Sequence, residues 1–189
     1  DGSMQLAGRF GKLGRYLVPG LVAVGLLGVT VLLQIRGGVY GSEFGQDADE
    51  PAHVVTGLMA YDFVAGMDWS EPMRFAENYY LHYPKVALGH WPPVFYVVQS
   101  AWMAVFGASR VSLLLLMACL SAALATMIYL LGRRYVPVPL ALVGALVFAA
   151  LPLVQRLSAT IMTEMLGALL IFGASVTFAG YLETKRPYR

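Results

Sequence analysis

The chain has 189 residues, of which 58% are hydrophobic and 13% charged, with a net charge of +2 and a mean hydropathy of +0.65. These values exclude an ordinary soluble domain and indicate an integral membrane protein with a few spans and one sizeable segment outside the membrane. The single cysteine, Cys119, excludes an internal disulfide. Residues 1–3, ahead of Met4, are expected to be a cloning remnant.

The first element in chain order is an apolar run over 17–35, which we expect to be an uncleaved membrane span. About twenty apolar residues suffice to cross a bilayer. The run is too long for the hydrophobic core of a signal peptide and lacks a small-residue cleavage site before polar sequence. The basic segment before it, 4–16, is expected to lie in the cytoplasm, since positive charges favour that side.

The long segment over 36–110 is expected outside the membrane and holds most of the polar chemistry. Eight of the eleven acids, all three histidines and all three tryptophans fall within it. We expect three amphipathic helices along it, at about 50–65, 71–79 and 92–107, lying at the membrane surface. A proline stands at or near the start of each, where the first turn of a helix tolerates it.

Three further apolar runs are expected to be spans. They cover 111–131, 136–154 and 165–182, with a second outer loop at 155–164 and a cytoplasmic end at 183–189. The predicted fold is therefore an all-α membrane protein with four transmembrane helices and juxtamembrane helices in the first outer loop. We expect a multi-pass protein of the cytoplasmic membrane with its active face outside.

One apolar run, 94–106, leaves the alternative of a fifth span open. It is shorter than the roughly twenty residues that a span needs, and its tryptophans and tyrosine suit an interface. If it crossed the membrane, Arg133-Arg134 and Lys185-Arg186 would both face outside, against the preference of basic residues for the cytoplasmic side. The four-span interpretation places both pairs inside.

A cluster of acids follows the first span, with Asp47, Asp49 and Glu50 close to His53. Like charges at short range repel one another, so such a cluster needs a reason. Capping the helix that begins near Pro51 would explain one acid but not three. A catalytic role remains an alternative, and so does a divalent cation held by Asp47 and Asp49 with the imidazole.

A fourth acid, Glu164, stands at the outer edge of the last span in otherwise apolar sequence. A carboxylate at that depth costs several kcal/mol unless it has a partner or faces water. Arg156, in the same outer loop, is the expected partner in a structural salt bridge. The alternative is a functional role for Glu164 beside the first cluster.

Cationic residues among aromatics form the third candidate group, with Tyr83, Lys85 and His90 near the membrane surface. A phosphate headgroup requires positive charge and hydrogen-bond donors, which this stretch supplies. The alternative is that these side chains only anchor the segment at the interface, and for Lys85 alone that alternative is favoured.

The order of these motifs resembles that of a known family. An outer Asp49-Glu50-Pro51-Ala52-His53 is followed by His90-Trp91-Pro92-Pro93-Val94-Phe95-Tyr96, by Phe106-Gly107-Ala108-Ser109-Arg110, by a span ending in Gly132-Arg133-Arg134, and by Glu164. This order is similar to the amino-terminal module of the membrane-embedded C-type glycosyltransferases. The nearest branch is that of the protein O-mannosyltransferases and lipid A aminoarabinose transferases. The resemblance covers about 15–185.

The resemblance implies a polyprenyl-phosphate-linked sugar donor, a hydroxyl acceptor and inversion at the sugar. Asp49 matches the acid that accepts the proton of the attacking hydroxyl, with Glu50 its neighbour. Glu164 stands where many relatives have an aspartate, a departure that weakens the transfer of its role. Lys85 and His90 would lie near the lipid phosphate, with His53, Tyr83 and Arg156 as further substrate-binding candidates.

The implied partners are membrane lipid and the lipid-linked donor, and we expect no nucleic acid. Family members usually continue for several more spans, whereas this sequence stops after the fourth expected one. Three interpretations stay open: a piece of a longer enzyme, a subunit that needs a partner membrane chain, or a module that binds a lipid-linked sugar or a protein without catalysis. A transporter subunit fits less well, because transport favours polar residues deep in the spans, and 111–131 and 136–154 offer only Ser121, Thr126 and similar small groups.

Overall fold

The computed structural model describes residues 2–42, 47–67, 69–87 and 89–184, with side chains in the first helix described from Leu17 onward. Every regular element in this part of the chain is helical. The elements are α1 (Gly2–Arg36), the short 3-10 helix η1 (Val39–Gly41), α2 (Glu50–Ala65), α3 (Pro72–His82), α4 (Val94–Phe106), α5 (Arg110–Gly132), α6 (Val138–Ala150), α7 (Pro152–Ser158) and α8 (Glu164–Thr184). Most of the expected cytoplasmic end, 185–189, and Asp1 of the expected remnant lie outside the described residues.

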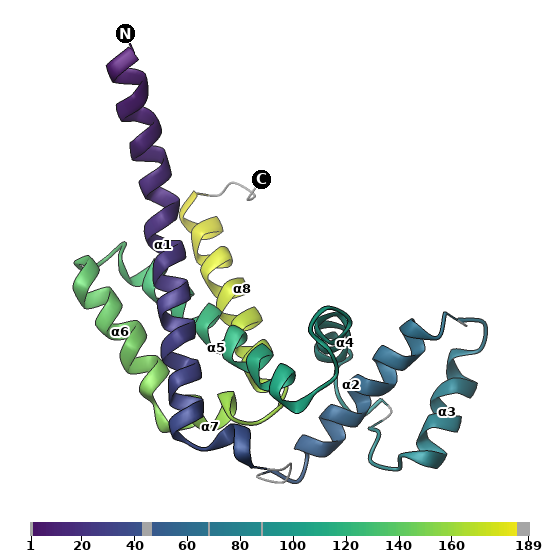
Figure 1. Cartoon of the computed structure of the whole chain (residues 1–189). Helices are drawn as coiled ribbons and strands as arrows, with labels where there is room; N and C mark the ends of the chain where they lie inside the picture. Colours follow the sequence, from purple (N-terminus) through teal and green to yellow (C-terminus); the bar gives the residue numbers. More distant parts are fainter. Residues whose placement is uncertain (1, 43–46, 68, 88, 185–189) are drawn as a thin grey trace.

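The all-helical membrane fold predicted from the sequence is confirmed. Three helical stretches are long and apolar enough to cross a membrane, namely Leu17–Arg36, Arg110–Gly132 and Glu164–Glu183. The pair α6 and α7 counts as a fourth if the two are taken as one broken span. In Figure 1, α1, α5, α6 and α8 form a bundle, and α1 begins toward the same end of it at which α8 finishes. The chain is a multi-pass membrane protein.

The run expected as one span over 136–154 is divided between α6 and α7. The two helices meet at an angle of 63°. Leu151 has extended backbone angles, φ −59° and ψ 132°. The break has a local cause, because a residue that precedes proline is disfavoured in the helical region and Pro152 follows directly. α6 alone has 13 residues, which at 1.5 Å each is shorter than the hydrocarbon core of about 30 Å.

The core of the bundle is built on α5, which packs against α1, α6 and α8. Met117 and Ala118 in the middle of α5 are fully buried. Small side chains fill a second cluster between α5 and α6 beside Leu26 of α1, namely Ala122, Ala125, Ala141 and Ala145. Alanines at a helix contact let the backbones approach closely, which is how membrane helices gain packing energy.

A buried amide joins three elements at the end of the bundle where α1 finishes and α5 begins. Gln34, near the end of α1, donates from Nε2 to the carbonyl of Leu114 at 3.1 Å and to that of Ser158 at 2.6 Å. The hydroxyl of Tyr40 donates to Gln34 Oε1 at 2.6 Å. A buried amide costs free energy unless it is hydrogen-bonded, so this arrangement fixes the ends of α1, α5 and α7 relative to one another.

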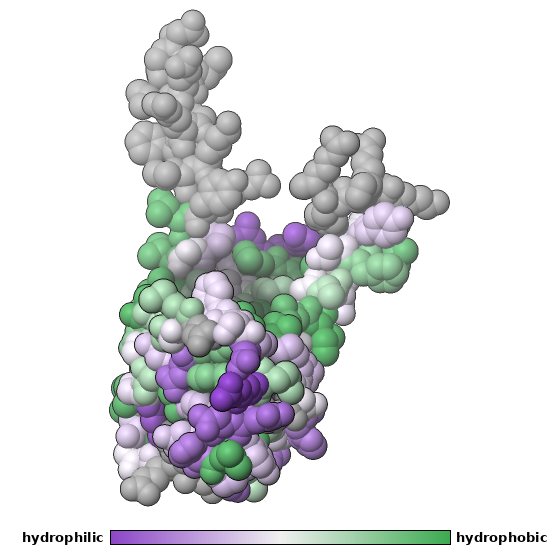
Figure 2. Space-filling model, turned by 90° about the vertical axis from the view of Figure 1, so that its right-hand side faces the viewer, coloured by the Kyte–Doolittle hydropathy of each residue, from purple (hydrophilic) through white to green (hydrophobic). Residues whose placement is uncertain are grey.

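Helices α2, α3 and α4 lie to one side of the bundle (Figure 1). α2 packs along α4, where the missing side chain of Gly57 leaves room for the buried amide of Gln99. α3 is held on α2 by an aromatic contact between Phe63 and Phe75, whose ring centroids are 5.2 Å apart. Seen from the α3 side, hydrophilic residues gather on the lower half of the surface, with hydrophobic residues around them (Figure 2).

Candidate active site

The three clustered acids occupy three different environments, and Asp47 is the one paired at the surface. Its Oδ1 accepts the backbone N–H of Asp49 at 3.2 Å, and its Oδ2 lies 3.4 Å from the Arg156 guanidinium on α7. The structure thus gives Arg156 a different partner from the one expected, which was Glu164. Asp47 thus joins the start of α2 to α7.

Glu50 is fully buried, with 0% of its side chain exposed. Its Oε1 accepts the backbone N–H of Ile161 at 3.2 Å and lies 3.8 Å from the guanidinium of Arg110. Arg110, the first residue of α5, also donates to the carbonyl of Val39 at 2.7 Å. A buried charge persists only when it is paired and hydrogen-bonded. Glu50 therefore fixes the start of α2 against η1, α5 and the loop before α8.

Asp49 differs from both neighbours because its side chain is exposed. It occupies the N-cap position of α2, but its carboxylate accepts no capping hydrogen bond from the helix. Capping, the structural alternative for this acid, is therefore absent. Asp49 is held by the backbone between an acid bound to Arg156 and an acid buried beside Arg110, and its carboxylate faces solvent.

His53, one turn into α2, is buried beneath the acids with 1% of its surface exposed. Its Nδ1 lies 2.9 Å from the hydroxyl of Tyr96, and its ring centroid is 4.3 Å from that of Trp91. Burial lowers the pKa of His53, while the nearby carboxylates of Glu164, Asp49 and Asp47 oppose that shift. Burial also raises the pKa of Tyr96 to about 12.

The carboxylate of Glu164 also acts on the charge of His53, although Glu164 lies 114 positions after Glu50 in the chain. Glu164 is the exposed first residue of α8, where a carboxylate complements the positive end of the helix dipole. Within the described residues it has no ion pair. Glu164, Asp49 and Asp47 thus all act on the charge of His53, although they come from two separate loops.

The cationic candidates lie in the loop between α3 and α4, and all are exposed. His90 contacts Trp91 edge to face at 4.6 Å, which places it beside the His53 cluster. Tyr83 instead packs on Tyr79 of α3 at 4.9 Å. Lys85 lies two residues beyond Tyr83 on the same loop. Of the three, His90 is joined to the site by a chain of ring contacts.

No group of three or more His, Cys, Asp or Glu side chains within the described ranges is arranged to hold a metal ion. The pair Asp47 and Asp49 suggested from the sequence therefore gains no third ligand of these types there. Asp47 instead has Arg156 as its partner. The donor set seen at this position is that of a hydrogen-bonded ion pair.

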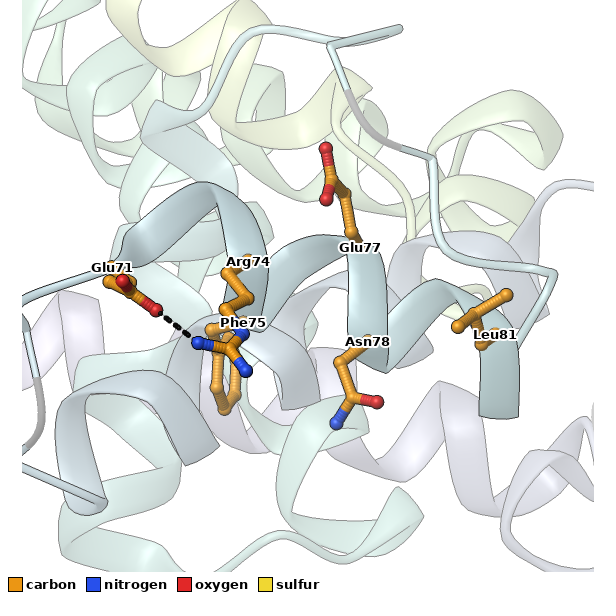
Figure 3. Close-up of a pocket in the computed structure, with 6 residues that line it drawn as sticks. All are labelled: Glu71, Arg74, Phe75, Glu77, Asn78 and Leu81. Atoms are coloured by element: carbon orange, nitrogen blue, oxygen red, sulfur yellow. Dashed lines mark hydrogen bonds and ion pairs between the residues drawn. The ribbon is translucent and has the colours of Figure 1, made fainter.

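A surface hollow of about 580 Å³ lies on α3, and its lining residues are shown in Figure 3: Glu71, Arg74, Phe75, Glu77, Asn78 and Leu81. The ion pair within it joins Arg74 and Glu71 at 2.9 Å, with 82% and 61% of the side chains exposed. Exposed pairs of this kind contribute about 0–1 kcal/mol. None of the residues predicted to form a site lines this hollow.

Two contributors to the site were not among the residues selected from the sequence as site candidates. Arg110 was noted only as the end of a motif, although an arginine at the end of a membrane span is itself a signal for an acidic partner. Tyr96 was taken as an interface aromatic. Its position three residues after Pro93, on the buried side of α4, is what directs its hydroxyl to His53.

Comparison with known proteins gives one match. A family model described as dolichyl-phosphate-mannose-protein mannosyltransferase matches residues 90–188, just over half of the 189 residues. The matched part runs from His90 through α4, α5, α6 and α7 to the end of α8, and includes Arg110 and Glu164. Asp49 lies outside it. No curated protein and no solved structure matches the chain.

Proposed function

Because the chain belongs to the dolichyl-phosphate-mannose-protein mannosyltransferase family, we propose that it transfers a sugar from a polyprenyl-phosphate-linked donor to a hydroxyl acceptor on the outer membrane face. The family resemblance predicted from the motifs is confirmed, and membership implies glycosyl transfer from a lipid-linked sugar. The residue roles, inversion and the face of the membrane are part of our proposal.

The observation that carries the proposal is that the three acids occupy three different environments. Asp47 is bound to Arg156 and Glu50 is buried beside Arg110, so Asp49 is the one acid of the cluster with an exposed and uncapped carboxylate. A general base must be able to reach the proton that it removes. Asp49 meets this requirement and Glu50 does not.

In the proposed reaction, the Asp49 carboxylate accepts the proton of the acceptor hydroxyl. The hydroxyl oxygen forms a bond to the anomeric carbon of the sugar, and the bond from that carbon to the phosphate oxygen breaks. Polyprenyl phosphate leaves with the electron pair. Attack from the side opposite to the phosphate inverts the anomeric carbon, and cations beside the leaving phosphate stabilise its charge.

The remaining residues have supporting roles in this proposal. Glu50 acts as a positioning residue through Arg110 and the N–H of Ile161. Glu164 orients the acceptor from the opposite loop, with His53 as the buried group between the acids. Lys85 and His90 supply positive charge and donors for the phosphate, as exposed residues of the loop that precedes α4.

We place the site on the outer face of the cytoplasmic membrane. The acids lie at the end of the bundle where α2 and α8 begin, and the basic pair Arg133-Arg134 follows α5 at the other end. Basic residues favour the cytoplasmic side, which supports this orientation.

The alternative of a divalent cation at Asp47 and Asp49 can be tested directly, by measuring the rate of sugar transfer before and after treatment with a chelator.

The experiment is sugar transfer by the native protein that contains this chain, reconstituted in proteoliposomes with a lipid-linked mannose donor. Asp49→Asn should lower kcat by roughly 10²–10⁴-fold, the range for loss of a general base. Glu71→Gln, an acid removed from the α3 hollow, is the matched control and should transfer normally. Full activity of Asp49→Asn would refute the proposal.

A second readout separates catalysis from binding alone. In the alternative function, the module binds a lipid-linked sugar and performs no transfer. Asp49→Asn should then leave donor binding unchanged and the wild-type protein should show no turnover. Turnover by the wild type together with retained donor binding by Asp49→Asn supports the transferase.

A further inference from the structure

A cavity of about 170 Å³ opens between α5 and α8, toward the end of the bundle at which α5 finishes. Four of its lining side chains are apolar and one is a cation, namely Met127, Leu130, Leu131, Val176 and Arg134. The two helices are in contact just before it, because a Cβ at Gly173 would lie only 3.5 Å from Cε of Met127. We name this the α5–α8 cavity.

The α5–α8 cavity lies at the boundary between the hydrocarbon layer and the headgroup layer. α5 has 23 residues, which at 1.5 Å each span about 34 Å, against a hydrocarbon core of about 30 Å. Residues 127–131 therefore lie at the edge of the hydrocarbon layer, and Arg134, two residues after α5 ends, lies at the level of the headgroups. Tyr135 follows with 74% of its surface exposed, as is common for aromatic residues at this level.

The cation of the α5–α8 cavity has no compensating acid among the described residues. The Arg134 side chain is exposed, and no ion pair or side-chain hydrogen bond joins it to another residue in the described part of the chain. Glu183, an exposed acid in the last turn of α8, lies seven residues beyond Val176, which is about 10 Å along the helix. The Arg134 guanidinium is therefore free to bind an anion from the membrane.

The neighbouring Arg133 shows what a simpler role for these bases would look like. A cation at the carboxyl end of a helix complements the helix dipole, and Arg133 and Arg134 share that position. Their side chains differ, however. The guanidinium carbon of Arg133 lies 5.9 Å from the centroid of the buried Tyr129 ring, whereas Arg134 lines the α5–α8 cavity. Arg133 is therefore a matched control for Arg134, with the same charge at the same helix end.

We propose that the α5–α8 cavity binds an anionic phospholipid, with an acyl chain against Leu130 and Val176 and the phosphate on the Arg134 guanidinium. The planar guanidinium can donate two hydrogen bonds to phosphate oxygens, and basic cavities between membrane spans suit anionic headgroups. A zwitterionic lipid has its own cation, which compensates its phosphate and weakens the attraction. In the orientation proposed above, the bound lipid belongs to the cytoplasmic leaflet.

A larger groove between α1 and α5 provides an internal contrast. It has a volume of about 410 Å³ and is lined by Ala23, Val24, Leu27, Cys119, Ala122, Ala123 and Thr126. None of these residues is a cation, and the Thr126 hydroxyl donates to the carbonyl of Ala122 at 2.7 Å. We therefore expect this α1–α5 groove to contact lipid chains without preference for a headgroup. If volume decided lipid binding, the α1–α5 groove would be the better site.

The first test is photo-crosslinking of the native protein that contains this chain, in proteoliposomes with a phosphatidylglycerol that carries a diazirine on its acyl chain. Mass spectrometry should find label at residues 127–134 and 173–176. Excess unlabelled phosphatidylglycerol should displace that label, whereas excess phosphatidylcholine should not. Label in the α1–α5 groove should fall equally with either competitor. No label at the α5–α8 cavity, or equal displacement there by the two lipids, would overturn the proposal.

The second test is a titration of the detergent-solubilised native protein with phosphatidylglycerol, followed by native mass spectrometry. Arg134→Gln should raise the Kd about five- to tenfold, in keeping with the loss of a charge-assisted hydrogen bond. Arg133→Gln should bind as the wild type does. An unchanged Kd in Arg134→Gln, or an equal rise in both variants, would reject the α5–α8 cavity as the site. Both tests measure lipid binding and need no sugar transfer, so they do not depend on the proposed function.

Discussion

The acidic junction at the start of α2, formed by Asp47, Asp49 and Glu50, and the hollow on α3 both contain charged residues. They differ in how far those charges are buried and in how many elements contact them. The hollow has a volume of about 580 Å³, but its ion pair is mostly exposed and joins residues only three positions apart in the chain. The acidic junction has a fully buried carboxylate that contacts α5 and the loop before α8. The difference teaches that charge held inside by several elements identifies this site better than the volume of a cavity.

The largest expected effect on stability comes from removing the buried charge. Glu50→Ala removes the buried carboxylate beside Arg110 and the acceptor of the Ile161 N–H. Breaking a buried ion pair in this way costs about 3–5 kcal/mol. The midpoint of thermal unfolding in detergent should therefore fall strongly. In the α3 hollow, Glu71→Ala removes an exposed ion pair worth about 0–1 kcal/mol and should change the unfolding midpoint little.

A double variant sharpens this comparison. Replacing Glu50 and Arg110 together removes both charges. The double variant should therefore lose less free energy of unfolding than the sum of the losses in the two single variants. Additive losses at Glu50 and Arg110 would show that the buried pair is not a unit. If Glu71→Ala lowered the unfolding midpoint as much as Glu50→Ala does, the two regions would not differ in the way described.

The next effect concerns pH and depends on His53. Burial holds its folded pKa below the ordinary value of 6.5, so below that value the unfolded chain binds more protons than the folded one. Stability should therefore fall as pH drops through 6.5 and below, until the folded state also protonates. His53→Gln removes this contribution and should flatten the dependence of the unfolding midpoint between roughly pH 5 and 8.

The control for this experiment is the exposed histidine of the neighbouring loop. His90→Gln leaves the buried ring, Tyr96 and the three carboxylates in place, so the slope of stability with pH should stay as in the wild type. An unchanged slope in His53→Gln would show that other groups set the acid sensitivity of the fold.

Much of the fold was predictable from the sequence, because membrane spans and amphipathic helices are specified locally. Runs of apolar residues have only helical solutions in a bilayer, and prolines favour the first turns of α2 and α3. The division of the 136–154 run was also encoded at Leu151-Pro152, where the proline outweighs the hydropathy of its neighbours. Hydropathy alone did not separate a continuous span from a bent pair.

The candidate site was predictable as a list of residues but not as a set of partners. Sequence reasoning selected Asp47, Asp49 and Glu50 together and paired Arg156 with Glu164. Which acid is buried depends on where Arg110 and Ile161 arrive from later in the chain, and local patterns contain no such information. The pairing of Arg156 with Asp47 depends in the same way on the position of α7.

The smallest expected effect compares two ion pairs whose arginines are both mostly exposed. Arg156 lies 3.4 Å from Asp47 in the acidic junction, and Arg74 lies 2.9 Å from Glu71 on α3. Because both guanidinium groups are mostly exposed, Arg156→Gln and Arg74→Gln should each change the free energy of unfolding by less than about 1 kcal/mol. Stability therefore cannot distinguish them, and activity can.

Only the first pair is linked to the proposed base, because Asp47 also accepts the N–H of Asp49. Arg156→Gln loosens Asp47 and should reduce sugar transfer a few-fold, since small displacements of a catalytic group lower the rate. Arg74→Gln should transfer as the wild type does. Equal rates for the two variants would mean that Arg156 does not help to position Asp49.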